Sequence, residues 1–183
     1  MHRALPLLFV CACANPPNPP PPPPAPTSEV IPVTTITAES SSFLSDTTGD
    51  YVASNVIDDK SDTAWCEGTK GLGAGETLTL TLAKTMNIES IEIDGGFFKD
   101  DRTLTNNGRP RKMTVTSDQG WSVEVAFPFV PLREHHAKEM VVKSTLVSGG
   151  GQAKQLVFTL VEADAGRFTK DTCISAIVLR KKL

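Results

Sequence analysis

The chain has 183 residues, of which 39% are hydrophobic and 21% are charged, and its formal net charge is −3. Acidic and basic residues are interspersed, and the net charge is small, which argues against a nucleic-acid-binding protein. About 150 residues follow the N-terminal region, and this length is enough to bury a hydrophobic core, so we expect one folded domain.

The N-terminus reads MHRALPLLFVCAC, in which Arg3 precedes an apolar run from Ala4 to Ala12. This pattern predicts a secretory signal peptide of the lipoprotein type over residues 1–12, because the run is too short to span a bilayer. The stretch Val10–Cys13 resembles a bacterial lipobox, which predicts lipidation of Cys13 and anchoring to the bacterial cell envelope, on the outer membrane or cell surface. An ordinary signal peptide with incidental cysteines is the alternative, and it predicts secretion.

Residues 13–29 are predicted to form a linker, because Asn15 to Pro26 is nearly all proline. A proline run cannot make helix or sheet hydrogen bonds and extends as a stiff polyproline II spacer. After a lipidated cysteine, such a spacer would act as a stalk, whereas without the anchor it would be a disordered tail. The folded domain is expected over residues 30–183.

Apolar and polar residues alternate with the period of a β-strand along most of this domain. Gly-, Asn- and Pro-rich turn signals separate the alternating segments, and no window has a sustained helical period. Many short strands of this kind predict an all-β sandwich or barrel, with at most a short turn near Ser54–Ile57. The predicted strands are Val33–Ala38, Glu76–Leu82, Ile88–Asp94, Lys112–Ser117, Ser122–Phe127, Met140–Lys143, Gln155–Glu162 and Ile174–Arg180.

The stretch Lys70–Leu82, KGLGAGETLTLTL, has glycines at alternating positions, like a nucleotide-binding loop. A phosphate-binding loop leads into a helix, whose N-terminus faces the anion. Here the glycines lead into a Thr-Leu alternation that is typical of a half-buried strand. We therefore expect Gly71, Gly73 and Gly75 to form a loop at one end of the sandwich, just before a core strand.

Several spaced stretches resemble a known family. Tyr51–Trp65 is similar to the signature Ala-x-Asn-x-x-Asp-Gly-x-x-x-Thr-x-Trp of discoidin and coagulation-factor type C domains. Together with Glu67–Glu76, Gly95–Arg102, Asn106–Lys112 and Asp171–Ile177, it resembles the NADase-type glycan-binding domain of bacterial surface proteins. The resemblance implies a galactose-binding-like jelly-roll β-sandwich whose loops at one end contact sugar. No stretch matches the catalytic domain that accompanies this module in toxins, so we do not expect NAD-hydrolase activity.

In discoidin-like folds the turn that contains Asp58, Asp62 and Thr63 often holds a structural calcium ion, and the resemblance extends this role to these residues. The sequence departs from the family pattern at Asp59, where a Gly is usual, and at Ala176, where many relatives have a Glu. The alternative is a turn in which these side chains bond their own backbone. Trp65 is expected in the core, at the base of the loops.

The segment Phe97–Arg111 is the main candidate for sugar contact, because it combines adjacent aromatic residues with planar donors and acceptors in a Gly-rich stretch. The alternative is a salt-bridged surface loop in which Phe97 points inward and Arg109 pairs with Asp101. The predicted glycan-binding residues are Phe98, Lys99, Asp101, Arg102, Asn107 and Arg109. We expect this segment to lie beside the Gly71–Gly75 loop.

Cys66 and Cys173 are the only cysteines of the domain, and a signal peptide would direct the chain to an oxidising compartment, so we predict a disulfide between them. For the whole protein, the favoured function is a non-catalytic carbohydrate-binding module on a bacterial cell envelope, with a glycan or cell-surface polysaccharide as its partner. The alternatives are a protein-interaction or adhesion module with the same fold and, less favoured, an enzyme whose site has no recognised motif. Apart from calcium, no cofactor is expected.

Overall fold

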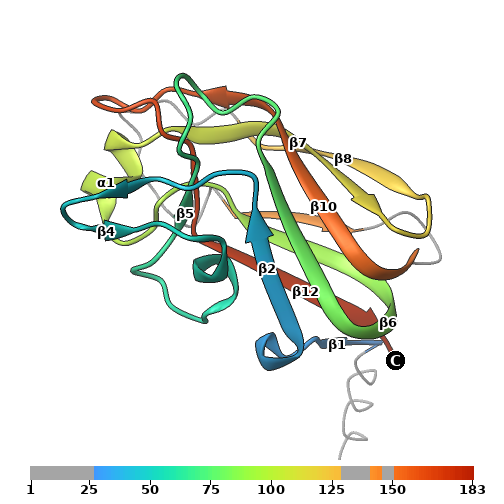
Figure 1. The fold of residues 1–183 in the computed structure, drawn as a ribbon. Helices are drawn as coiled ribbons and strands as arrows, with labels where there is room; N and C mark the ends of the chain where they lie inside the picture. The colour runs from blue at the N-terminus through green and yellow to red at the C-terminus, as the bar shows by residue number, and fades with distance from the viewer. Residues whose placement is uncertain (1–26, 129–140, 146–150) are drawn as a thin grey trace, which may run out of the picture.

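The computed structural model describes residues 27–128, 141–145 and 151–183 (Figure 1). The predicted signal peptide, Cys13 and all of the proline run lie outside the described residues. The strands are β1 (Ser28–Val30), β2 (Ile36–Ser40), β3 (Ser45–Asp46), β4 (Gly49–Asp50), β5 (Trp65–Cys66), β6 (Thr77–Asp94), β7 (Arg109–Ser117), β8 (Ser122–Ala126), β9 (Val141–Thr145), β10 (Gly151–Asp164), β11 (Cys173–Ile174) and β12 (Ala176–Lys182). The helical elements are the 3-10 helices η1 (Val33–Thr35) and η2 (Ala53–Ile57) and the α-helix α1 (Asp101–Asn106).

A single 18-residue strand, β6, holds the two layers of the sandwich together. Its first half pairs with β2 on one side and with β10 on the other, and β10 continues to β7 and β8. Its second half pairs with β12 and β9, and the start of β10 also pairs with it at Met86–Ile88. The strand bends between the two halves, so one continuous eight-stranded sheet folds over on itself (Figure 1).

The core lies between the two layers and follows from the alternation of apolar residues along the strands. Leu78, Leu80 and Leu82 of β6 are buried, while the threonines between them are only partly covered. The same alternation places Leu156, Phe158 and Leu160 of β10 inside. Burial of this apolar surface is the main stabilising contribution to the fold.

The predicted strands lie where the structure has strands. The differences concern where a strand begins or ends and whether two predicted strands form one. The stretches predicted as Glu76–Leu82 and Ile88–Asp94 are one bent strand, because β10 pairs with β6 on both sides of the bend, with a register shift between Ala153 and Gln155. The first half of the stretch predicted as Val33–Ala38 is the 3-10 helix η1. The predicted turn at Ser54–Ile57 is confirmed as η2. The short strands β1, β3, β4 and β5 were not predicted.

The first and last strands of the sandwich pair with each other. Ser28 of β1 lies opposite Lys182 of β12, and the Leu183 N–H donates to the Thr27 carbonyl at 3.1 Å. The chain therefore enters and leaves the described sandwich at the same place. Within residues 27–128, 141–145 and 151–183, no helix is long and apolar enough to cross a lipid bilayer.

Candidate functional site

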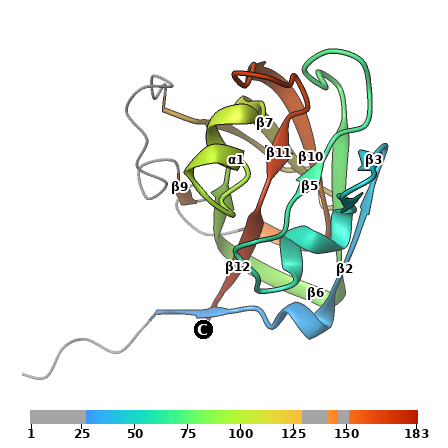
Figure 2. The same ribbon diagram turned by 90° about the vertical axis from the view of Figure 1, so that its left-hand side faces the viewer.

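Four segments that are distant in sequence meet at one end of the sandwich, which we call the loop end (Figure 2). They are the β3–β4 hairpin, residues 67–76, α1 with its flanking residues, and residues 164–172. Backbone hydrogen bonds join them. The Glu67 N–H donates to the Thr172 carbonyl at 3.1 Å, and the Gly108 N–H donates to the Asp171 carbonyl at 2.9 Å.

The predicted disulfide between Cys66 and Cys173 is confirmed, and it lies at the base of the loop end. The two Cα atoms are 4.1 Å apart, and both residues are buried. The bond links β5 to β11, where Cys66 lies directly opposite Cys173. Phe97 packs into the same cluster and meets the Tyr51 ring edge-on, with ring centroids 5.9 Å apart. This cluster therefore fixes the segment that leads into α1.

Residues 101–106 form the helix α1, so the expectation of a helix-free segment is wrong at this point. Asp100 caps the helix, because its Oδ1 accepts from the Thr103 N–H at 2.7 Å while its own N–H donates to Thr103 Oγ1 at 3.0 Å. The Thr103 N–H, together with the Thr103 hydroxyl that donates to the same Oδ1 at 3.0 Å, holds the pKa of the Asp100 carboxyl below its ordinary value. Leu104 is the buried residue of α1, which leaves most of the helix facing solvent.

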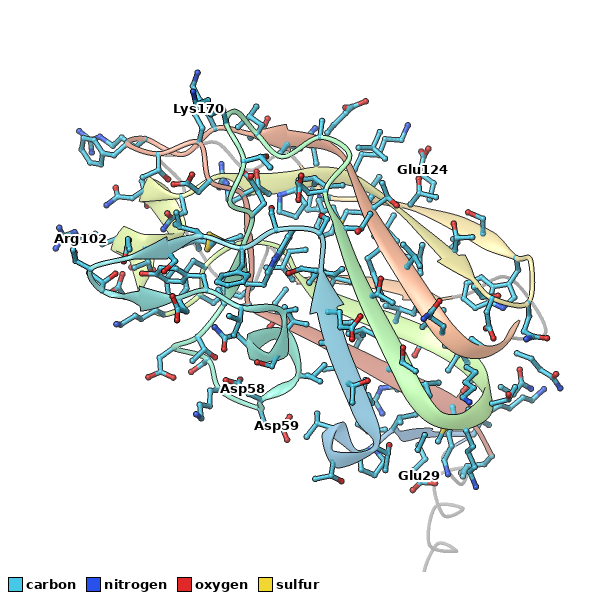
Figure 3. The ribbon with its side chains drawn as sticks, in the orientation of Figure 1. Glu29, Asp58, Asp59, Arg102, Glu124 and Lys170 are labelled. Carbon is cyan, nitrogen blue, oxygen red and sulfur yellow. A yellow bond between two sulfur atoms is a disulfide. The ribbon has the colours of Figure 1, made fainter. Side chains whose placement is uncertain are left out.

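Three of the six predicted glycan-binding residues are exposed at the start of this helix: Lys99, Asp101 and Arg102. Figure 3 shows Arg102 extending outward from the loop end. Phe98 is partly buried, and its backbone N–H donates to Ser175 Oγ at 2.9 Å. The structure therefore places Lys99, Asp101 and Arg102 near one another at the start of α1. A hydrogen bond to Ser175 fixes the backbone at Phe98.

The other two predicted residues are engaged by the scaffold. The Asn107 side chain donates to the Thr103 carbonyl at 2.8 Å and accepts from Thr169 Oγ1 at 3.1 Å. Arg109 is only 3% exposed, because it has entered β7. Burial lowers the pKa of its guanidinium, and the Asp164 carboxylate acts in the opposite direction. The interior position removes Arg109 from the residues that can meet a ligand at the surface.

Residues 164–172, which sequence analysis did not single out, carry an exposed aromatic ring at the loop end. Phe168 is 73% exposed, and the Arg167 guanidinium carbon lies 5.3 Å from the centre of its ring. The backbone beneath them is fixed to α1, since the Arg167 N–H donates to the Thr105 carbonyl at 2.9 Å and the Phe168 N–H to the Asn106 carbonyl at 3.3 Å. The sequence signal that could have pointed to this part of the loop end is the adjacent pair Arg167 and Phe168 in a loop between two strands.

The glycine loop ends at β6, as expected from the Thr-Leu alternation, so its glycines bend the chain before a strand. Gly73 has a φ of 70°, and a Cβ there would lie 2.5 Å from the Cγ of the buried Glu67. The loop does not lie directly beside α1, because residues 164–172 run between them. On that side Thr172 Oγ1 donates to the Leu72 carbonyl at 3.0 Å.

At the predicted calcium turn, Asp58 and Thr63 bond each other. Thr63 Oγ1 donates to Asp58 Oδ2 at 2.9 Å, and the Lys60 N–H donates to Asp58 Oδ1 at 3.0 Å. Asp62 is exposed, and the described residues hold no group of three or more His, Cys, Asp or Glu side chains arranged for a metal. Hydrogen bonds within the turn therefore engage the side chains of Asp58 and Thr63. Calcium binding stays a prediction.

The model of one protein family, the NAD glycohydrolase translocation F5/8 type C domain, matches residues 30–180. Among curated proteins, none matches this chain.

Solved structures of carbohydrate-binding modules have the same fold. The family 32 module of Clostridium perfringens NanJ, solved with galactose, has a TM-score of 0.60 at 23% identity, covering 84% of this chain and 99% of that one. The module CBM32-3 of a C. perfringens family 31 glycoside hydrolase has a TM-score of 0.62 at 15% identity, with coverage of 84% and 95%. A third C. perfringens module, solved with GalNAc-β-1,3-galactose, has a TM-score of 0.54 at 13% identity, with coverage of 82% and 99%. The predicted all-β, galactose-binding-like fold is confirmed.

Proposed function

The chain belongs to the NAD glycohydrolase translocation F5/8 type C domain family, and from this premise we propose that it is a non-catalytic glycan-binding module. The proposed site is the loop end, where Phe168 and Arg167 stand beside the exposed residues of α1. The observation that carries the proposal is the 73% exposure of Phe168 on a backbone that α1 holds in place. A large apolar ring left in water at a fixed position is suited to the apolar face of a sugar.

The chemistry of the neighbouring side chains supports this assignment. Arg102 and Arg167 offer forked donors that match pairs of sugar hydroxyls, and Asp101 offers acceptors. The similar modules from C. perfringens were solved with galactose or with GalNAc-β-1,3-galactose. For this chain we propose a glycan ligand of the same general class. Affinity for a single sugar should be weak, because its hydroxyls exchange bonds to water for bonds to protein at little net gain.

Replacing Phe168 by Ala is expected to weaken glycan binding by about 10-fold or more, since burying a Phe side chain is worth roughly 1.5–3 kcal/mol. The melting temperature should stay nearly unchanged, because the side chain is mostly exposed. A glycan array first identifies a ligand, and titration calorimetry with that saccharide then compares the variant with the original protein.

Leu183→Ala is the matched control, because Leu183 is also exposed, at 68%, but follows the end of β12 that pairs with β1, away from the loop end. It should bind as the unmodified protein does. Equal binding by the Phe168→Ala variant would remove Phe168 from the site. If no saccharide binds, while a protein partner is retained that free saccharide does not displace, the loop end is a protein-interaction surface instead.

We also propose that the module is displayed on a bacterial cell envelope through lipidated Cys13 and the proline-rich stalk. The stalk joins β1 at Ser28, which pairs with the far end of β12, whereas the start of β12 follows β11 at the loop end. A tether attached there leaves the loop end pointing away from the membrane.

Replacing Cys13 by Ala is expected to release the protein from the membrane fraction into the soluble fraction. Immunoblotting of fractionated cells measures the distribution. Cys11→Ala is the control, since it removes the neighbouring cysteine and leaves the proposed acylation site. A Cys13→Ala variant that stays in the membrane fraction would exclude the lipid anchor.

A further inference from the structure

Five basic residues are exposed at the loop end, and they come from three of its segments. Lys99 and Arg102 belong to α1 and its approach, Arg167 and Lys170 to residues 164–172, and Lys70 to the glycine loop. Figure 3 shows that Arg102 and Lys170 both extend away from the body of the protein at this end. Within the part of the chain that the structure describes, none of the five forms an ion pair with a carboxylate.

Two of these cations lie on segments that hydrogen bonds hold next to Phe168. Arg167 lies over the Phe168 ring, with 5.3 Å between the guanidinium carbon and the ring centre. Arg102 lies four positions before Asn106, and residues at this spacing share one face of a helix. The Asn106 carbonyl accepts from both the Phe168 and the Thr169 N–H groups, so this loop is attached to the C-terminal turn of α1, one turn from Arg102.

Most of the carboxylates around these cations are already engaged. Asp100 caps α1, Asp164 pairs with Arg111 at 3.4 Å, and the buried Glu67 accepts from Thr69 and Thr172. Asp100, Asp101 and Asp171 lie beside the five cations and keep their charge, because a hydrogen bond does not neutralise a carboxylate. The acidic hairpin β3–β4 lies on the other side of β5 and β11 from α1 (Figure 2).

Around Phe168, five exposed cations therefore outnumber Asp100, Asp101 and Asp171, on a chain whose net charge is −3. Unpaired guanidinium and ammonium groups around a water-exposed ring bind carboxylate or sulfate oxygens through charge-assisted hydrogen bonds, which are about twice as strong as neutral ones. We propose that the ligand of this site is an acidic glycan, one whose sugar carries a carboxylate or a sulfate. This inference rests on the proposed glycan-binding function and names the class of its ligand.

The test compares each neutral sugar with an acidic counterpart that differs in one anionic group: galactose with galacturonic acid, and lactose with lactose 3′-sulfate. Binding by the full protein is measured by calorimetry or ligand-observed NMR at about 50 mM and about 500 mM NaCl, since salt screens exposed charges. The variants are Arg102→Gln and Lys170→Gln. Lys154→Gln is the matched control, because it removes one exposed cation near the start of β10, away from the loop end.

The unmodified protein and Lys154→Gln are expected to bind each acidic sugar about 10-fold more tightly than its neutral counterpart at low salt. High salt and the two loop-end variants should reduce that preference. Equal affinity for acidic and neutral sugars would overturn this inference and leave the glycan-binding proposal standing. If no sugar of either kind binds, both this inference and the proposed glycan-binding function fail. The inference also fails if phosphatidylserine vesicles bind, with the same dependence on Arg102 and Lys170, while sugars do not.

Discussion

Replacing Cys66 and Cys173 together by Ala is expected to lower the free energy of unfolding by about 2–5 kcal/mol, the usual range for a native disulfide. The bond closes a loop between residues 107 positions apart in sequence, so the cross-link strongly restricts the unfolded chain. It also joins β5 to β11 beneath the loop end, where Cys66 lies opposite Cys173. Alanine leaves no buried thiol or hydroxyl in place of the sulfur atoms.

Denaturant unfolding, followed by intrinsic fluorescence under oxidising conditions, measures this change. Adding dithiothreitol to the unmodified protein should reproduce the loss, and the same reagent should leave the double variant unaffected. An unfolding midpoint that is the same with and without the bond would show that β5 and β11 are held by packing alone.

The second large effect is expected at Trp65, the largest fully buried side chain of the core. Its exposed fraction is 0%, and its Nε1–H donates to the Ser42 carbonyl at 2.9 Å. Truncation to Ala removes this packing and leaves a cavity, which costs about 3–5 kcal/mol for a buried aromatic residue. The loss of the hydrogen bond adds to the cost, because the Ser42 carbonyl loses its partner.

Trp121 provides the matched comparison within the same chain. It also donates through Nε1–H, to the Gln152 carbonyl at 2.7 Å, but its ring is only partly buried. Trp121→Ala should therefore lower the free energy of unfolding less than Trp65→Ala in the same denaturant experiment. If both variants lost the same free energy of unfolding, the buried position of Trp65 would not determine how much it contributes to stability.

The sheet and its core could be predicted from the sequence because their signals are local and regular. Leu78, Leu80 and Leu82 alternate with threonines, and this period has a single explanation, a strand with one buried face. The cysteine pair was also predicted, since the domain has only two cysteines, and the core position of Trp65 was predicted from the family resemblance. The bend in β6 was not predicted, because both of its halves have the pattern of an ordinary strand.

Helix α1 could not be found by periodicity, because six residues with one buried side chain contain no repeat. Its signal is the cap, Asp100 with Thr103 three residues later, which has chemical meaning only once the chain is seen to turn there. The same limit applies to the polar residues around it. Arg102 and Arg109 are chemically alike, and nothing in their local sequence shows that one faces water and the other enters β7.

Phe168 was missed for a related reason. Its neighbours give no strand or turn pattern, and its role depends on two carbonyl groups of α1, more than sixty positions earlier, that accept its N–H and that of Arg167. Sequence patterns record what a residue prefers locally, whereas a binding surface depends on which distant segments the fold brings together.

The pairing of β1 with β12 has a consequence for how the protein is made. A chain that emerges N-terminus first presents β1 and Cys66 long before their partners exist, because Ser28 pairs with Lys182 and Cys66 bonds to Cys173. The long strand β6 likewise waits for β10 and β12. Contacts of such long range form late and slowly. These pairings therefore cannot form while the chain is still being synthesised, and Cys66 stays unpaired until Cys173 has been made.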